Sequence, residues 1–142
     1  MHKHRDIGLK LTPQRIAILD YLEGNRRHPS AEDIYRGVLD RFPTMSFATV
    51  YTTLSALKVK QKVIELTIDP DKKRYDPDTR LHNHLICIIC RQIIDVAGAG
   101  TSKPPRENKG FMIIESHTDF YGLCPACRKL HPDQEEHHVR RP

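Results

Sequence analysis

The sequence has no long apolar run. Its longest apolar stretch, residues 85–89, includes a candidate metal ligand and is far shorter than the roughly 20 residues that a transmembrane helix needs. Residues 1–5 are charged and lead into no apolar segment, so we expect no secretory signal and no membrane association. We therefore expect a cytoplasmic protein, whose four cysteines bind a metal rather than form disulfides.

Catalytic sequence motifs are also missing. The chain contains no P-loop, no GxGxxG dinucleotide motif and no pattern typical of a Ser-His-Asp hydrolase. A zinc hydrolase would need three protein ligands, a bound water and a general base, and no sign of a substrate pocket accompanies the candidate ligands. We predict that the protein is not an enzyme.

Positive charge is concentrated in the first part of the 142-residue chain, whose formal net charge is +5. Residues 1–80 hold 15 Lys and Arg against 11 Asp and Glu, whereas residues 81–142 hold 8 against 7. The first part is therefore the candidate nucleic-acid surface, although a charge of this size also suits an ordinary basic protein.

Three helices followed by a hairpin are predicted in residues 1–76. Thr12-Pro13 begins the first helix, with Thr12 as its cap. Ser30 caps the second helix, with an acidic residue three positions later, and Ser46 caps the third. Two β-rich segments around an Asp-Pro-Asp turn then predict a hairpin. This order of elements is typical of a winged helix-turn-helix.

A hinge is predicted at residues 77–80, before a second domain at residues 81–131. The second domain has short β-rich segments around pairs of cysteines, and its Gly- and Pro-rich residues 97–110 are not expected to form a long helix. The polar residues 132–142 are expected to be a flexible tail. The sequence thus predicts an α+β protein, with an N-terminal winged helix-turn-helix followed by a small α/β domain.

The four cysteines form two Cys-x-x-Cys pairs, Cys87 with Cys90 and Cys124 with Cys127. The two-residue gap lets both sulfurs of a pair face one ion, and two pairs complete a tetrahedral set of thiolates that selects Zn²⁺. Such a closed site stabilises a fold and catalyses nothing. A redox dithiol is the competing interpretation. Because 33 residues separate the pairs, the residues between them must fold as an element of their own.

Histidines and aspartates lie close to the first cysteine pair in the sequence. On a strand, His82 and His84 point the same way, and Asp76 and Asp95 are near enough to add oxygen ligands. His28 lies in the loop before the second helix. Nitrogen and oxygen donors of this kind suit Fe²⁺, Mn²⁺ or Zn²⁺. Each histidine taken singly can also be a core or surface residue, and Asp76 can be a turn residue. The spacing alone therefore does not decide between a second metal site and none.

Ordered motifs extend along nearly the whole chain. They include Leu11-Thr12-Pro13-Gln14-Arg15, His28-Pro29-Ser30-Ala31-Glu32-Asp33-Ile34-Tyr35, Ala48-Thr49-Val50-Tyr51, His82-Asn83-His84 and Tyr121-Gly122-Leu123-Cys124. Together these motifs resemble the ferric uptake regulator family. The resemblance implies a homodimeric, metal-dependent transcriptional repressor with a winged helix and a C-terminal α/β dimerisation domain. Its partner would be double-stranded DNA that carries an inverted-repeat operator.

The resemblance also implies three sets of site residues. The four cysteines would hold a structural Zn²⁺. The ligands of a regulatory Fe²⁺ or Mn²⁺ would be His28, Asp76, His82, His84 and Asp95. The residues that contact DNA would be Arg15, Ser46, Thr49 and Tyr51, with Tyr51 reading bases in the major groove. No further metal site is assigned to Glu107, Glu115 or His117, because the Pro- and Gly-rich residues 98–110 are short where relatives often carry a longer helix.

Within this family, the peroxide-responsive branch looks most similar. The chain has Asp95 where iron-uptake members more often carry Glu. The branch implies that Fe²⁺-catalysed oxidation of a ligand histidine, His28 or His82, releases the metal and then the DNA. Two alternatives remain. One is a repressor that senses iron or manganese levels and controls metal uptake genes; the other, outside the family, is a zinc-ribbon interaction module without DNA binding.

Overall fold

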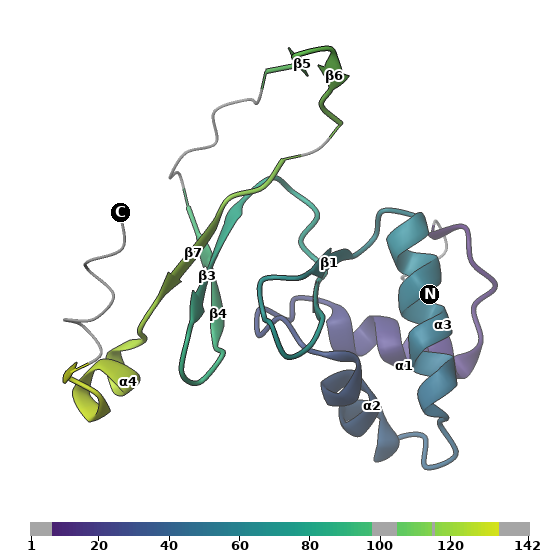
Figure 1. Ribbon diagram of the computed structural model, residues 1–142. Helices are drawn as coiled ribbons and strands as arrows, with labels where there is room; N and C mark the ends of the chain where they lie inside the picture. The colour runs from purple at the N-terminus through teal and green to yellow at the C-terminus, as the bar shows by residue number, and fades with distance from the viewer. Residues whose placement is uncertain (1–6, 98–104, 115, 134–142) are drawn as a thin grey trace. The chain divides into compact units, whose positions relative to one another are not determined.

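The computed structural model describes residues 7–97, 105–114 and 116–133 (Figure 1). The chain divides into two compact units, Met1–Arg80 and Leu81–Pro142. Most of the expected flexible tail lies outside the described residues, as does Glu115.

Three helices form most of the first unit. They are α1 (Pro13–Leu22), α2 (Ala31–Leu39) and α3 (Phe47–Val59). Each begins where the sequence predicts a cap: the hydroxyl groups of Thr12 and Ser46 each accept a hydrogen bond from the backbone N–H three residues later. Ser30 and Asp33 form a full capping box, because each side chain accepts from the other residue's backbone N–H.

The apolar faces of these helices pack into one core. Its fully buried members include Ile18 of α1, Ile34 of α2, and Val50 and Leu54 of α3. Burial of one such side chain contributes about 1.5–3 kcal/mol, so helix packing is the main stabilising term of this unit.

A hairpin follows the helices, as predicted. Strands β1 (Ile64–Leu66) and β2 (Arg74–Asp76) pair in the antiparallel sense. In the turn between them, Asp69 Oδ1 accepts a hydrogen bond from the backbone N–H of Asp71 at 2.9 Å, which is the local bond typical of an Asp turn. Tyr75 of β2 is buried in the helical core, so the hairpin is anchored to the helices through this ring.

Glu65 links the hairpin to α3 by charge as well. Its Oε1 lies 3.0 Å from the ammonium group of Lys58 in α3 and 3.2 Å from that of Lys73. Burial opposes the ionisation of Glu65, but the two ammonium groups outweigh it and lower the pKa of this carboxyl below its usual value. The ionised side chain therefore bridges the two elements.

A three-stranded sheet, in the order β4–β3–β7, forms the centre of the second unit. Its strands are β3 (Asn83–Cys87), β4 (Ile93–Val96) and β7 (Asp119–Gly122). β3 pairs antiparallel with β4 and parallel with β7. Parallel neighbours need a long connection, which here contains the two-stranded hairpin of β5 (Glu107–Asn108) and β6 (Phe111–Met112).

A short helix, α4 (Pro125–Leu130), follows β7 and was not predicted from the sequence. Six residues are too few for a helical apolar pattern to be recognised. Cys124 is its N-cap, and its sulfur accepts a hydrogen bond from the Cys127 backbone N–H at 3.4 Å. The helix therefore sets the positions of both cysteines of the second pair.

The α+β organisation, with helices first and small sheets after them, is confirmed. Of the helices in the described ranges, none combines the length and apolar composition that crossing a bilayer requires.

Candidate metal centres and DNA-binding face

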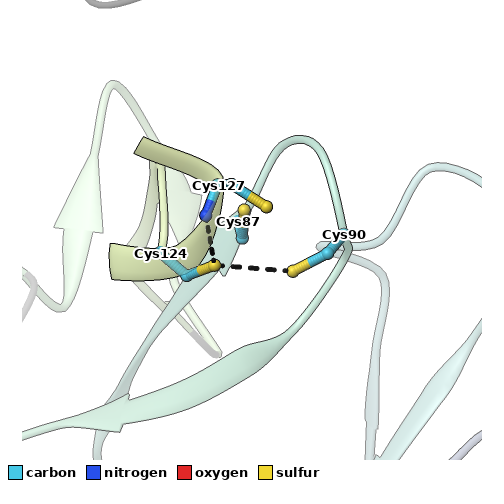
Figure 2. A group of neighbouring side chains, drawn as sticks. All are labelled: Cys87, Cys90, Cys124 and Cys127. Atoms are coloured by element: carbon cyan, nitrogen blue, oxygen red, sulfur yellow. Dashed lines mark hydrogen bonds between the residues drawn. The ribbon is translucent and has the colours of Figure 1, made fainter. Parts of the chain in front are cut away.

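The two cysteine pairs lie together in the second unit (Figure 2). The parallel pairing of β3 with β7 places Cys87 opposite Gly122, two residues before Cys124. The Sγ atoms of Cys90 and Cys124 are 3.8 Å apart, and all four sulfurs lie within 4.8 Å of one another. Four sulfurs at this spacing can reach a single ion, since a Zn–S bond is about 2.3 Å long.

The electrostatics of the cluster also favour a cation. Burial opposes ionisation of Cys87, but hydrogen bonds from the backbone of Cys124, Cys90 and Ile89 lower the pKa of its thiol to about 6. The neighbouring side chain of Cys124, together with burial, raises the pKa of Cys127 to about 12. Thiolates at this spacing repel one another, because like charges repel at short range. A divalent cation removes this repulsion, so the donor set fits Zn²⁺.

His28 and Asp76 form a buried pair in the first unit. His28 Nε2 lies 3.4 Å from Asp76 Oδ2, and the two side chains are 0% and 3% exposed. The other carboxylate oxygen of Asp76 accepts the backbone N–H of Asp78 at 2.8 Å, which fixes the orientation of the carboxyl group. His28 has a left-handed backbone conformation, with φ of 52°, which costs a non-glycine residue roughly 1–2 kcal/mol.

Asp95 is shared by two histidines in the second unit. Its Oδ1 lies 3.2 Å from His82 Nε2 and 3.6 Å from His84 Nε2. The strand register explains the geometry, because His84 of β3 pairs directly with Asp95 of β4. The rings of His82 and His84 are 4.5 Å apart, so the two side chains do point the same way. One carboxylate and two imidazoles thus converge, and such nitrogen and oxygen donors suit Fe²⁺, Mn²⁺ or Zn²⁺.

The predicted DNA contacts lie at the beginnings of α1 and α3. Tyr51 is 43% exposed, and its ring packs edge-on against Phe47 at 4.9 Å, so it is held in place while part of its surface remains accessible. The Ser46 hydroxyl caps α3 by accepting the backbone N–H of Thr49, and it lies 2.7 Å from the Thr49 hydroxyl. Arg15 donates to the carbonyl oxygen of Lys10 at 2.9 Å.

One structural residue near the candidate site was missed in the sequence. Arg74 is buried beside the loop of His28, where its guanidinium group contacts backbone carbonyl groups and Asp69. The alternation of side chains along β2 could have shown it, since Arg74 is two residues from Asp76 and shares its face. His117, in contrast, is exposed and lies 3.7 Å from Asp119, which gives no reason to assign it to a metal.

Comparisons with known proteins agree on one family. The profile of the ferric uptake regulator family matches residues 6–121. The chain is 37% identical over 128 residues to the peroxide operon regulator of Bacillus subtilis, covering 88% of both chains. It is 35% identical over 133 residues to the peroxide-responsive repressor PerR of Staphylococcus aureus, covering 87% of this chain and 86% of the other. The fold is similar to that of the ferric uptake regulator of Francisella tularensis with iron, with a TM-score of 0.71 and 28% identity over 85% of this chain and 96% of the other.

Proposed function

The chain belongs to the ferric uptake regulator family and is a metal-dependent transcriptional regulator; from this premise we propose that it is a homodimeric repressor that releases its operator DNA when peroxide oxidises a histidine at an Fe²⁺ site. The observation that carries the proposal is that Asp95 already lies beside both His82 and His84, the second of which is its partner in the strand register. The proposal has four parts, which concern the structural zinc, the regulatory metal, the DNA and the signal.

The structural part is a Zn²⁺ held by Cys87, Cys90, Cys124 and Cys127. Four thiolates leave no coordination position for a substrate, so the ion joins the turn after β3 to the start of α4 and has no catalytic role. Its binding free energy becomes folding free energy of the second unit.

The regulatory part is an ion held by donors from both units. His28 and Asp76 come from the first unit, and His82, His84 and Asp95 come from the second. An ion bound by all five selects one arrangement of the units. It then promotes DNA binding only as far as its affinity for that arrangement exceeds its affinity for others.

The DNA-binding part is the first unit, with α3 as the reading helix. Tyr51 contacts bases, and Arg15, Ser46 and Thr49 contact the duplex around it. Two symmetric copies imply an inverted-repeat operator, with half-sites about one helical turn or a simple multiple apart. Exposed Lys and Arg side chains of this unit contact phosphates, and binding therefore weakens steeply with salt.

The sensing part concerns peroxide. Bound Fe²⁺ would promote cleavage of the O–O bond of hydrogen peroxide beside the imidazoles. Overall, one oxygen atom would go to the imidazole, which loses two electrons, and the other oxygen atom would leave as water. The family resemblance makes His28 and His82 the candidates for oxidation, and each has its Nε2 atom beside a carboxylate. An oxidised ring is a poorer ligand, so the two units lose their common ion and the DNA is released. The names of the two peroxide-responsive relatives support this choice of signal.

The test begins with metal analysis of protein purified without oxygen. Fe²⁺-loaded protein on inverted-repeat DNA is then titrated with hydrogen peroxide, with Mn²⁺-loaded protein as the matched control. We expect the Fe²⁺ form alone to leave the DNA, with adducts of +16 Da on peptides that contain His28 or His82. An Fe²⁺ form that stays bound and carries no adduct would instead favour a regulator that responds to iron or manganese levels.

A further inference from the structure

Strand β2 presents two buried polar side chains on one face. Side chains alternate along a strand, so Arg74 and Asp76 share a side of β2, while Tyr75 between them enters the helical core. The polar side meets the loop that carries His28. Asp76 faces the imidazole of His28, and Arg74 contacts the backbone of the same loop.

Arg74 holds this loop by its carbonyl groups. Its Nε donates to the carbonyl oxygen of His28, and its Nη2 donates to that of Arg27 at 3.2 Å. Its Nη1 lies 2.9 Å from Asp69 Oδ2, and the side chains of Arg74 and Asp69 are only 9% and 0% exposed. Arginine suits this position because its planar fork of N–H groups can serve several acceptors at once.

The backbone of His28 explains why such a hold matters. Its φ of 52° lies in the left-handed region, which residues other than glycine rarely adopt. The neighbouring backbone is tied to the same strand, since the Tyr75 N–H donates to the Pro29 carbonyl oxygen at 2.8 Å. The bond from Arg74 falls on the carbonyl group of the left-handed residue itself.

We propose that Arg74 is a positioning residue of the regulatory metal site: by binding the carbonyl group of His28 it holds the imidazole against Asp76, so that two ligands are ordered before the metal arrives. The inference rests on the proposed function, because it assumes that His28 and Asp76 bind the regulatory ion. Ligands that are already ordered lose less conformational entropy on binding, so the affinity for the metal rises. Asp69 contributes by fixing the guanidinium group.

The alternative is that the ion pair of Arg74 with Asp69 only closes the turn between β1 and β2. A purely structural role predicts lower stability but unchanged coordination in the molecules that remain folded. A positioning role predicts altered metal coordination in folded protein. It also predicts that Arg74→Lys retains more of the Mn²⁺ affinity than Arg74→Met.

The test uses full-length, zinc-loaded protein with Mn²⁺ and Co²⁺ as probes. Arg74→Lys keeps the charge but loses the fork of donors, and Arg74→Met loses both. Arg41→Lys is the matched control, because Arg41 forms an exposed ion pair with Asp20 in the same unit. Mn²⁺ affinity, the Co²⁺ absorption spectrum and urea unfolding are measured for each protein.

We expect Arg74→Lys to weaken Mn²⁺ binding about tenfold or more, as losses of residues that orient metal ligands commonly do. Its Co²⁺ spectrum should change while its zinc content does not, and Arg41→Lys should match the wild type throughout. Asp69→Asn should act in the same direction but more weakly, and it serves in place of Arg74→Lys if that variant does not fold.

Unchanged Mn²⁺ affinity and an unchanged Co²⁺ spectrum in folded Arg74→Lys, or in Asp69→Asn as its substitute, overturn the positioning role and leave the proposed function intact. Failure of the proposed function is recognised separately. In that case His28→Ala binds Mn²⁺ as tightly as the wild type, and the assumption behind the inference falls with it.

Discussion

The Nε2 atom of His28 lies 3.4 Å from a carboxylate oxygen of Asp76, although one residue belongs to the loop before α2 and the other to strand β2. Both side chains are almost completely buried. Ser30, which caps α2, follows His28 by two residues. The unit that carries the proposed reading helix therefore also carries two of the proposed metal ligands, and one of them, His28, lies two residues before the cap of α2.

The first prediction concerns the four-cysteine cluster. Cys124→Ser should lose zinc and much of the fold of the second unit, because binding free energy at a structural zinc site, on the order of 10 kcal/mol, is also folding free energy. Zinc content and circular dichroism measure the two effects. Chelation of zinc from the wild type should reproduce them. A Cys124→Ser protein that stays folded and zinc-loaded would show that the cluster is not the structural site.

The second prediction concerns base reading by α3. Tyr51→Ala should weaken operator binding by about 1–3 kcal/mol while binding to random DNA changes little, if the side chain contacts a base. Tyr51→Phe is the control, because it keeps the ring against Phe47 and removes only the hydroxyl group. Gel shifts on both DNAs provide the measurement. An equal loss of affinity for operator and random DNA would mean that Tyr51 contacts the DNA backbone rather than the bases.

The third prediction concerns the response to peroxide. Asp95→Glu keeps the carboxylate, so metal-dependent DNA binding should survive. The added methylene moves the oxygen that now faces His82 and His84 by about one C–C bond, which exceeds the roughly 0.2 Å that a metal site tolerates. Release of DNA by peroxide should therefore be blunted, as measured by a peroxide titration of the Fe²⁺-loaded complex.

Asp119→Glu is the matched control for this experiment, since Asp119 lies on the neighbouring strand β7, opposite His84. It should respond like the wild type. If Asp95→Glu also responds like the wild type, the peroxide role can stand, but Asp95 does not determine it.

The fourth prediction concerns the cap of α2 and its dependence on pH. Burial acts to raise the pKa of Asp33, but hydrogen bonds from the backbone and hydroxyl group of Ser30 outweigh it and lower the pKa below the usual 3.8. A lowered carboxyl pKa stabilises the fold above the unfolded-state value, and this contribution is lost as the pH falls through the folded-state value. Ser30→Ala should cost about 1 kcal/mol near neutral pH.

In urea unfolding, the difference between Ser30→Ala and the wild type should then shrink as the pH is lowered below 3.8. A difference that stays constant from neutral pH to strong acid would mean that the ionised form of Asp33 contributes nothing to the cap.

The fifth prediction concerns the contact between α1 and α2. A Cβ atom at Gly37 would lie 2.1 Å from a ring carbon of Tyr21, so the ring must move. Alanine favours a helix over glycine by about 1 kcal/mol, but overpacking of this kind costs about 1–3 kcal/mol. Gly37→Ala should therefore destabilise the wild type and stabilise a Tyr21→Ala variant. If Gly37→Ala changed the free energy of unfolding in the same direction in both backgrounds, the close approach of Gly37 to Tyr21 would be contradicted.

The local features of this protein follow from short stretches of sequence. Thr12, Ser30 and Ser46 mark the starts of three helices because a cap needs only a side chain and a backbone N–H three residues away. The direction shared by His82 and His84 follows from strand alternation in the same way. The spacing of the cysteine pairs indicated that they form one cluster, and the sulfurs do lie together.

Long-range features were decided only by tertiary structure. The parallel pairing of β3 with β7 brings Cys87 to the second cysteine pair, and no local pattern specifies which strands pair. The hold of Arg74 on the carbonyl group of His28 depends on β2 packing beside a loop far away in the sequence. Sequence alone thus determined which donors the chain contains and where α1, α2 and α3 begin, because a helix cap depends on interactions over three or four residues. Which donors lie close together depends on packing between distant segments. Sequences with the same local pattern could pack those segments differently, so the local pattern does not determine the site.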